Sequence, residues 1–273
     1  MEFIEAKMPP NGTLRLTSDW QVGSVTFDET KIEPLLRPVL TEKDYRLALI
    51  GDLVDAITHK DKRFTFDDLD ERYSTPLDQL AYVEETLRPV AKRVVSLGAG
   101  NHEFAIRDMG DPTKLLARNL GVPYGGYNAL VRVNKATRML LWHGRASLNS
   151  NLPNAMQRNF AVKRALVTTN NLRWGRLNVD LVAQGHVNQL AVVSPSESAE
   201  IQMDYDWDKR HIKATEAEQD PRWFAVCGSL QRMYVEGRTS YVEMMGRTYP
   251  LPLGCVDVEF RRSKIVDVRT VRL

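Results

Sequence analysis

Carboxylate, amide and imidazole side chains recur beside glycine at five places in the sequence. Three of the five histidines stand next to glycine or asparagine at the end of an apolar run. Carboxylate, amide-oxygen and imidazole ligands suit Mn²⁺, Fe, Zn²⁺ and related ions. Their recurrence in one context predicts a metal or catalytic site rather than isolated turns and core histidines. The five places are Asp19; Gly51, Asp52 and Asp55; Gly100, Asn101, His102 and Glu103; His143 and Gly144; and Gly185 and His186.

An α/β pattern of short apolar runs and helical stretches must position these residues. Successive places are 33 to 49 residues apart, about one strand–helix–strand unit or a hairpin pair. The strand ends can therefore meet at one edge of a sheet. From Gln189 onward the pattern becomes strand-rich and closes in a hairpin-like arrangement. Before it, we expect strands running into loops over 14–20, 45–55, 93–103, 127–133, 138–144 and 179–187, and helices over 29–40, 76–92, 112–120 and 153–170.

The whole chain is long enough, at 273 residues and 43% hydrophobic, to bury a substantial core. No linker is visible, so we expect a single domain over 1–273, with a polar surface insertion at about 194–221. Only two cysteines occur, and the first residues carry acids with no apolar stretch behind them. Because no run reaches the roughly 18 apolar residues of a membrane helix, we expect a soluble cytoplasmic protein without a membrane partner.

The ordered motifs resemble those of the calcineurin-like metallophosphoesterase superfamily. In that superfamily Asp-x-His, Gly-Asp-x-x-Asp, Gly-Asn-His-Asp/Glu, a histidine usually followed by glycine, and Gly-His-x-His occur in this order. The resemblance runs from about residue 14 to 188, and GDLVD (51–55) and GNHE (100–103) are its specific parts. It implies a four-layer α/β/β/α sandwich of two mixed sheets with a centre of two divalent ions.

The resemblance also implies a role for each matching residue. Asp52 would bridge the two ions, and two ions about 3.5 to 4 Å apart would clamp the phosphoryl oxygens and make a bridging hydroxide the nucleophile. His102 would act as general acid or cationic stabiliser. Asp55 would orient His102, although a helix-capping or turn carboxylate is the alternative. Asp19 would hold the first ion, and the second would be completed by Asn101, His143 and His186.

Two positions depart from the superfamily pattern. The first motif reads Asp19-Trp20-Gln21 and the last reads Gly185-His186-Val187-Asn188, so both missing imidazoles belong to the same ion site. We infer that this site is oxygen-rich, with the amide oxygens of Gln21 and Asn188 beside Asp19 and Asp52. Such ligands favour Mg²⁺, Mn²⁺ or Ca²⁺ over Zn²⁺. The rival hypothesis is a weak or empty Asp19 site and a slow or inactive enzyme.

Charge is unevenly distributed along the chain, although the formal net charge is only +2. Residues 112–179 contain eleven basic and no acidic residues, which leaves 26 basic and 35 acidic residues elsewhere. A basic surface beside a metal centre would attract a polyanion, whereas solvated helix faces are the alternative. Arg145, two residues after His143, is the candidate for binding a substrate phosphate, with Asn101 as a second candidate. The basic residues are Lys114, Arg118, Arg132, Lys135, Arg138, Arg145, Arg158, Lys163, Arg164, Arg173 and Arg176.

Two functions follow from these features. The first is a metal-dependent hydrolase of phosphate esters, with Mn²⁺ favoured and Mg²⁺, Fe or Zn²⁺ as alternatives. Its substrate would be a phosphodiester such as nucleic acid, because of the basic segment. The second is a weakened or inactive metal-binding module that binds an acidic partner through residues 112–179. Neither the physiological substrate nor the oligomeric state follows from the sequence.

Overall fold

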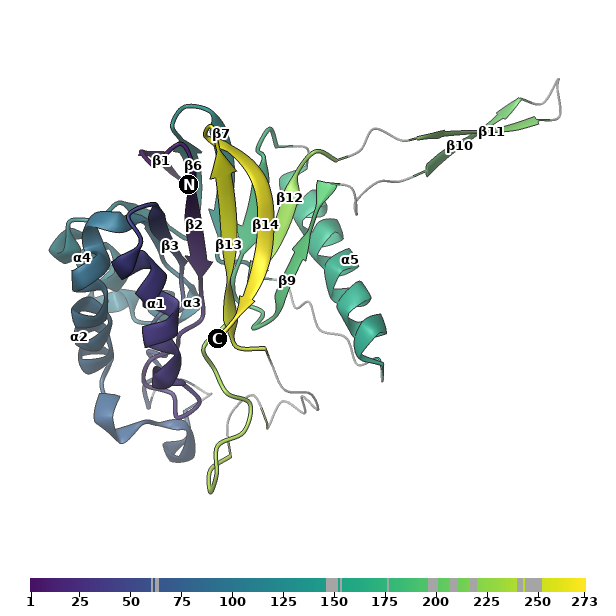
Figure 1. Cartoon of the computed structure of the whole chain (residues 1–273). Coiled ribbons are helices and arrows are strands. Elements are labelled where there is room, and N and C mark those ends of the chain that lie inside the picture. Colours follow the sequence, from purple (N-terminus) through teal and green to yellow (C-terminus); the bar gives the residue numbers. More distant parts are fainter. Residues whose placement is uncertain are drawn as a thin grey trace.

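Two six-stranded mixed sheets pack face to face over the described part of the chain (Figure 1). Sheet 1 has the order β14-β13-β2-β3-β4-β5 and sheet 2 the order β1-β6-β7-β8-β12-β9. The structure is a computed structural model. It describes residues 1–59, 61, 64–145, 152, 154–175, 177–195, 201–206, 211–216, 220–239, 243 and 252–273, and for 201–206 and 211–216 the backbone only.

Sheet 1 is parallel from β2 to β5 and antiparallel from β2 through β13 to β14. Its inner strands are buried along most of their length, which is why they read as nearly continuous apolar runs. The strands are β14 (Lys264–Arg272), β13 (Gly254–Arg261), β2 (Gly12–Thr17), β3 (Tyr45–Ile50), β4 (Val94–Gly98) and β5 (Tyr124–Gly126).

Sheet 2 places β7 and β8 in parallel at its centre, and β12 continues the same direction beside β8. The hairpin partner of β7 is β6, which in turn pairs with β1 in parallel. The strands are β1 (Glu2–Ala6), β6 (Asn128–Val133), β7 (Thr137–Trp142), β8 (Leu181–Gln184), β12 (Trp223–Cys227) and β9 (Leu190–Val193).

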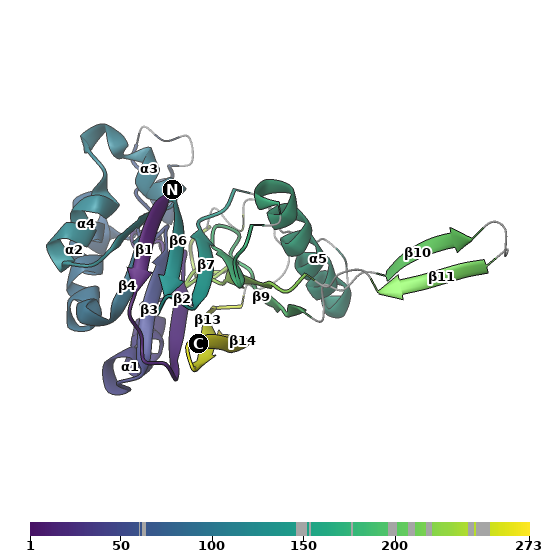
Figure 2. The same cartoon turned by 90° about the horizontal axis from the view of Figure 1, so that it is seen from above.

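Helices cover the outer faces of both sheets. Figures 1 and 2 show α1, α2 and α4 on sheet 1 and α5 on sheet 2. Local sequence sets several helix ends: Thr75 and Asp78 form a capping box at the start of α2, and Gly121 ends α4 at a φ of 67°. The helices are α1 (Ile32–Thr41), α2 (Pro76–Leu87), α3 (Asn101–Ala105), α4 (Pro112–Leu120) and α5 (Ala155–Trp174).

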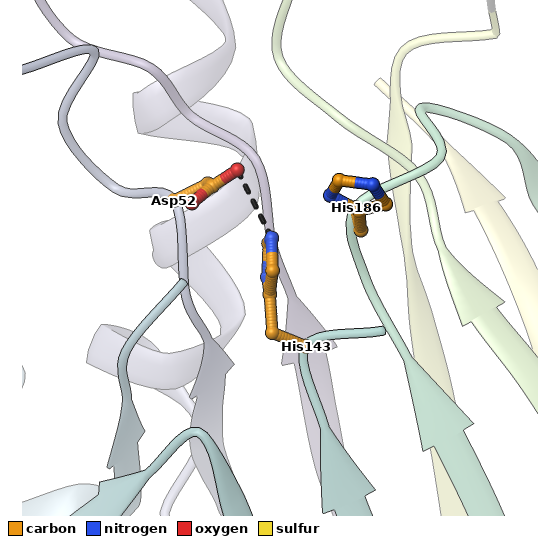
Figure 3. A group of neighbouring side chains, drawn as sticks. All are labelled: Asp52, His143 and His186. Carbon is orange, nitrogen blue, oxygen red and sulfur yellow. Dashed lines mark ion pairs between the residues drawn. The ribbon is translucent and has the colours of Figure 1, made fainter. Parts of the chain in front are cut away.

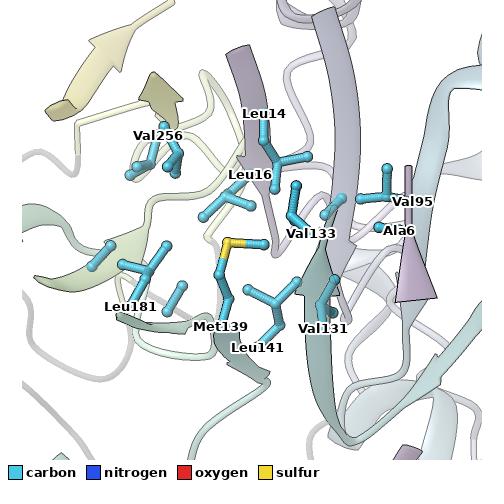
Figure 4. Packing of buried hydrophobic residues seen from close by; sticks show 14 of the residues in the cluster. Ala6, Leu14, Leu16, Val95, Val131, Val133, Met139, Leu141, Leu181 and Val256 are labelled. Atoms are coloured by element: carbon cyan, nitrogen blue, oxygen red, sulfur yellow. The ribbon is translucent and has the colours of Figure 1, made fainter. Parts of the chain in front are cut away.

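Three apolar clusters separate four layers. The central cluster lies between the sheets, where Leu14 and Leu16 of β2 meet Met139 and Leu141 of β7 (Figure 4). A second cluster joins sheet 1 to α1, α2 and α4, and a third joins sheet 2 to α5. Because a sheet buried on both faces needs such a layer on each side, the order is helix, sheet, sheet, helix. This is the expected four-layer α/β/β/α sandwich.

The insertion expected at about 194–221 contains an antiparallel pair of strands, β10 (Ile201–Asp206) and β11 (His211–Glu216). Both views show this pair extending away from the two sheets (Figures 1 and 2). Residues 196–200, 207–210 and 217–219 lie outside the described part. In the part that is described, no helix is sufficiently long and apolar to span a bilayer.

Candidate metal centre

The predicted residues follow parallel strands of both sheets. Asp19, Asp52 and Asn101 come after β2, β3 and β4 of sheet 1, whereas His143 and His186 come after β7 and β8 of sheet 2. Parallel neighbours deliver their carboxyl ends to one edge. The packing of the two sheets then brings the two sets of loops together. The sequence predicted one such edge, and the structure forms it from two sheets.

Asp52, His143 and His186 form a group that could hold a metal ion, because one ligand atom of each lies within 4.8 Å of the others (Figure 3). Oδ2 of Asp52 is 3.0 Å from Nε2 of His143. Oδ1 of Asn101 lies 3.1 Å from the same nitrogen and 2.7 Å from Nδ1 of His186. The structure therefore brings together all four residues predicted for the second ion.

The ring of His143 is oriented for ligation by its other nitrogen. Nδ1–H donates to the carbonyl oxygen of Ile50 at 2.9 Å, so Nε2 faces the oxygens of Asp52 and Asn101. A backbone acceptor behind a histidine is the usual way in which a metal-binding imidazole is fixed. Two imidazoles, a carboxylate and an amide oxygen suit a divalent transition ion, so the residues fit the implied metal.

Electrostatic interactions within the group are strong because Asp52 and His143 are buried. Burial opposes charge on His143, but the carboxylates of Asp52 and Asp19 raise its pKa to about 9. Burial also works against ionisation of Asp52, and the rings of His143 and His102 nevertheless hold its pKa well below the usual range. A buried carboxylate that stays ionised beside imidazoles is a ready cation ligand.

Asp19 lies beside this group and is fully buried. Its Oδ2 accepts the backbone N–H of His186 at 2.9 Å, whereas Oδ1 has no hydrogen-bond partner among the described residues. Burial raises the pKa of Asp19 to about 7, with Asp52 adding to the effect and His143 opposing it. A buried carboxylate oxygen that accepts no hydrogen bond destabilises the folded protein unless a cation or another positively charged group binds it.

His102 stands at the start of α3, where its backbone N–H donates to Oδ1 of Asp52 at 2.9 Å. Its ring Nδ1 is 2.5 Å from the backbone oxygen of Asp55 and 3.5 Å from the Asp55 carboxylate. Asp55 therefore contacts the His102 ring as the sequence suggested, but its carbonyl makes the closer contact. The Nε2 end lies 3.9 Å from Oδ2 of Asp52, on the side of the metal candidates.

Backbone strain is concentrated in the loops of the centre. Five of the ten described non-glycine residues with positive φ are predicted site residues. Conformations of this kind cost about 1 to 3 kcal/mol each and collect where function requires them. Both sheets use the same device, with positive φ at alternate residues. The residues and their φ angles are Asp19 (53°), Gln21 (49°), Asp52 (51°), His186 (72°) and Asn188 (51°).

Gln21 and Asn188 are linked by a residue that the sequence did not single out. The side-chain amide of Gln231 donates to Oε1 of Gln21, and its Oε1 accepts from Nδ2 of Asn188 at 2.8 Å. The oxygen of Gln21 is thus used within the protein. Oδ1 of Asn188 is buried and has no partner among the described residues, so the two amides are not equivalent as ligand candidates.

The comparisons with known proteins give structural likenesses only. No family model and no curated protein matches the sequence. The structure of YfcE, a phosphoesterase from E. coli, is 18% identical, with 95% of this chain and 100% of that chain covered and a TM-score of 0.43. Vps29 from Cryptosporidium parvum is 14% identical, with 96% and 98% covered and a TM-score of 0.42.

A metallophosphoesterase from Sphaerobacter thermophilus is 12% identical, with 95% of this chain and 88% of that chain covered and a TM-score of 0.39. Phosphoesterases thus stand among the similar structures, as the motifs led us to expect. At such identities, and with TM-scores below 0.5, these likenesses decide neither family nor activity. The assignment of a family and an activity therefore has to be argued from the residues of the candidate centre.

Aromatic and basic residues flank the imidazoles. Tyr127 packs edge-on against His143 with ring centroids 5.5 Å apart, and Phe104 packs edge-on against Tyr127 at 5.3 Å. Burial raises the pKa of Tyr127 to about 12, with Asp52 adding to the effect and Arg145 and Arg173 opposing it. The Tyr127 hydroxyl is therefore within electrostatic reach of Asp52 and of two exposed guanidinium groups, of which that of Arg173 lies over the rings of Trp142 and Trp174.

Two other basic residues of the segment 112–179 lie on different elements, β6 and α4. Arg132 pairs with Glu5 at 2.7 Å, far along the chain, and Arg118 lies exposed on α4 at the outer face of sheet 1. Arg176 lies outside the described residues. The described part of the segment is thus not one surface, and the charges of Arg145 and Arg173 act on Tyr127, which packs against His143.

Glu103 is a structural residue that the motif contained but the sequence did not explain. Its carboxylate is buried and accepts the backbone N–H groups of Asp52 at 3.0 Å, Leu53 at 2.6 Å and Gly100 at 2.8 Å. It ties the loop after β3 to the start of α3. The signal was present, because an acid three residues after a helix N-cap is a capping residue.

Proposed function

We propose that the chain is a metal-dependent hydrolase of phosphate esters that acts on phosphodiesters. One observation carries the proposal: Asp52, Asn101, His143 and His186 converge from two sheets on one point, and the ring of His102 reaches the same Asp52 carboxylate, with its Nε2 3.9 Å from Oδ2. Structural ion sites are usually closed by their ligands alone. Here an oriented imidazole stands beside the ligands without being one of them, which favours chemistry.

Two divalent ions, with Mn²⁺ favoured, would be held by these residues and by Asp19. When bound, such ions stabilise charge on phosphoryl oxygens and supply a nucleophile at neutral pH. Asp52 contacts His143 at 3.0 Å, and its charge contributes to the raised pKa of Asp19. Interaction with residues of both proposed ion sites suits the predicted bridging role. Asn101 contacts both imidazoles and remains a candidate for binding a substrate oxygen.

His102 is the proposed general acid. Its Nδ1 is held at the carbonyl oxygen of Asp55, which fixes the ring and directs Nε2 towards the carboxylate of Asp52. A proton on Nε2 can then pass to the leaving oxygen of the ester. Such proton transfer contributes about 10²- to 10⁴-fold in rate.

A phosphodiester is the proposed substrate class because of the rim of the centre. Arg145 and Arg173 are exposed and within electrostatic reach of Tyr127, and Arg107 lies over the ring of Phe104 at 4.1 Å from its centroid. Guanidinium groups bind phosphate oxygens, and aromatic rings such as the half-buried Phe104 and Tyr127 can stack on bases. A nucleic-acid substrate would use both, so we favour a nuclease-like enzyme.

The test measures hydrolysis of bis-p-nitrophenyl phosphate and p-nitrophenyl phosphate with Mn²⁺, with Mg²⁺ and with chelator. Wild type should hydrolyse the diester faster than the monoester, and it should hydrolyse either one only when a divalent ion is present. Asp52→Asn and His102→Ala should each lower turnover by at least about 10²-fold. The exposed variant Glu33→Gln on α1, whose carboxylate pairs with Arg37, serves as the matched control.

Circular dichroism and thermal melting of each variant separate lost chemistry from lost folding. Turnover that survives chelation or both substitutions would refute the hydrolase. No turnover with any ion would favour the module that binds an acidic partner. A monoester preference would refute the diester part alone.

A further inference from the structure

A chain of buried hydrogen bonds leads away from the metal centre. Nδ2 of Asn188 donates to Gln231, and Nε2 of Gln231 is 3.2 Å from Oγ1 of Thr26. Oγ1 of Thr26 is 2.7 Å from Oγ of Ser24, which lies 3.1 Å from Oδ1 of Asp68. All five residues are buried, with side chains at most 8% exposed. The chain therefore has no ready exchange with solvent.

Counting donors fixes the direction of the chain. A carboxylate only accepts hydrogen bonds, so the Ser24 hydroxyl must give its single proton to Asp68. Ser24 then accepts from Thr26, and Thr26, its own proton used, accepts from the amide nitrogen of Gln231. That leaves the oxygen of Gln231 to accept from Asn188, so the nitrogen of Asn188 is committed to the chain.

The consequence falls on the other end of the Asn188 amide. With its nitrogen held by Gln231, Asn188 presents an oxygen, and that oxygen is buried without a partner among the described residues. Oδ1 of Asp19 is in the same condition. A buried acceptor that is left unpaired destabilises the folded protein, and a bound cation would provide both oxygens with a partner.

Backbone contacts hold these groups together. The backbone N–H of Leu230, next to Gln231, donates to the carbonyl of Asp19 at 3.1 Å. The backbone N–H of His186, two residues before Asn188, donates to the Asp19 carboxylate at 2.9 Å. The two unpartnered oxygens thus belong to segments that are bonded to each other.

We propose that the chain from Asp68 through Gln231 orients Asn188 as an oxygen ligand and thereby makes the Asp19 site selective for a hard divalent cation. Gln231 is then a specificity-determining residue, positioned behind the ligand. The proposal rests on the proposed function for the existence of the metal centre. It adds that one ion is bound by imidazoles and the other by oxygens alone, and that Gln21 does not supply one of those oxygens.

The experiment counts ions rather than turnovers. One equivalent of Zn²⁺ is added to the metal-free full-length protein to fill the imidazole side, and Mn²⁺ is then titrated while free Mn²⁺ is followed by electron paramagnetic resonance. Wild type should bind one Mn²⁺ per chain. Gln231→Leu should weaken this Mn²⁺ site by about 10- to 100-fold, the usual effect of removing a group that orients a ligand.

A pair of variants at the far end tests direction without touching the centre. Asp68→Ala removes the acceptor, so the Ser24 hydroxyl can turn and the chain can reverse, and Mn²⁺ binding should weaken by about tenfold or more. Asp68→Asn keeps an acceptor oxygen for Ser24 and should bind Mn²⁺ within a few-fold of wild type. Because Asp68→Ala and Asp68→Asn differ only in the carboxamide group at residue 68, comparing them remains informative if Gln231→Leu does not fold.

Two outcomes overturn the inference. One is Mn²⁺ binding that is the same in wild type, Gln231→Leu and Asp68→Ala, and the other is a second Zn²⁺ that binds wild type as tightly as the first. Diester hydrolysis by wild type together with either outcome would leave the proposed function standing. If Gln231→Leu and Asp68→Ala selectively lose Mn²⁺ binding but wild type hydrolyses neither ester, the inference about Gln231 would stand and the proposed function would fall.

Discussion

Oδ2 of Asp52 lies 3.0 Å from Nε2 of His143, and this contact joins loops that follow strands of different sheets. Asp52 follows β3 of sheet 1, and His143 follows β7 of sheet 2. The geometry of the candidate centre therefore depends on the packing of the two sheets across the apolar cluster between them. Stability of that interface and ion binding should be linked, because a ligand that binds only the folded state stabilises it.

Ion binding should strengthen as pH rises and should release protons. The pKa values of about 9 for His143 and about 7 for Asp19 mean that both hold a proton at pH 6 in the metal-free protein. An ion requires both to be deprotonated. Titration calorimetry with Mn²⁺ in buffers of different ionisation enthalpy should show release of about one or two protons at pH 6, falling towards none near pH 9.5. A proton count independent of pH would contradict these assignments.

The same shifts set the pH dependence of stability in the metal-free protein. A histidine whose pKa is raised in the folded state contributes stability below its unfolded pKa, and this contribution is lost as pH rises through about 9. Asp19, an acid with a raised pKa, loses its contribution as pH rises from its ordinary value to about 7. The melting temperature without metal should therefore fall between pH 6 and pH 9, and saturating Mn²⁺ should reduce that fall. A metal-free melting temperature that is flat or rising over this range would oppose the prediction.

His102 and Asp55 should differ in their effect on turnover. His102→Ala removes the proposed acid and should lower kcat by about 10²- to 10⁴-fold. Asp55→Asn keeps the backbone carbonyl that lies 2.5 Å from Nδ1 of His102, so kcat should stay within about tenfold of wild type. Steady-state kinetics on the diester provide the comparison. Equal losses in the two variants would show that the Asp55 carboxylate, rather than its carbonyl, orients the ring.

Substrate affinity should depend on the guanidinium groups of Arg145 and Arg173. Arg145→Gln and Arg173→Gln should each raise KM for a diester by about tenfold at low salt, with little change in kcat, because a charged hydrogen bond is worth about 1.5 to 3 kcal/mol. Each should also reduce the salt dependence of single-stranded DNA binding.

Arg118→Gln is the matched control, because Arg118 is exposed on α4, which Figures 1 and 2 place on the opposite side of the molecule from α5. The basic rim would lose its role if all three variants bound DNA with the same salt dependence.

Glu103 should matter for stability and for ion binding together. Burial raises the pKa of its carboxyl group, with Asp52 adding to the effect, while backbone N–H donors oppose it. Glu103→Gln would place an amide N–H₂ against those donors and should lower the free energy of unfolding by about 2 to 4 kcal/mol. Chemical denaturation measures the loss, and a change below about 0.5 kcal/mol would show that the loop after β3 does not depend on this carboxylate.

Much of this arrangement was predictable because local rules and strand direction agree. GDLVD and GNHE were recognisable from their glycines, and Gly100 shows why glycine is required: a Cβ there would lie 2.0 Å from Oδ1 of Asp52. The two runs 45–55 and 93–103 were predicted as strands ending in loops, and β3 and β4 lie within them. The run 93–103 was wrong at its end, because α3 begins at Asn101 with Glu103 as its capping acid.

The remainder depended on pairings that no local pattern encodes. β1 was not predicted, since Glu2–Ala6 pairs with β6 from far along the chain. Gln231 and Asp68 were missed for the same reason: neither lies in a motif, and the hydrogen bonds from Gln231 to Asn188 and from Asp68 to Ser24 each join residues more than 40 positions apart. Long-range polar contacts of this kind follow from packing and not from periodicity.

The central claim is tested most directly by the position of a bound ion. A crystal structure of the protein grown with Mn²⁺, with anomalous scattering measured at the manganese edge, should show a manganese peak at one point. That point is bonded to Oδ2 of Asp52, Oδ1 of Asn101, Nε2 of His143 and Nδ1 of His186. No manganese peak at this point, with Asn101 keeping its present contacts with both imidazoles, would contradict the account, whereas a further peak at Asp19 and Asn188 would not.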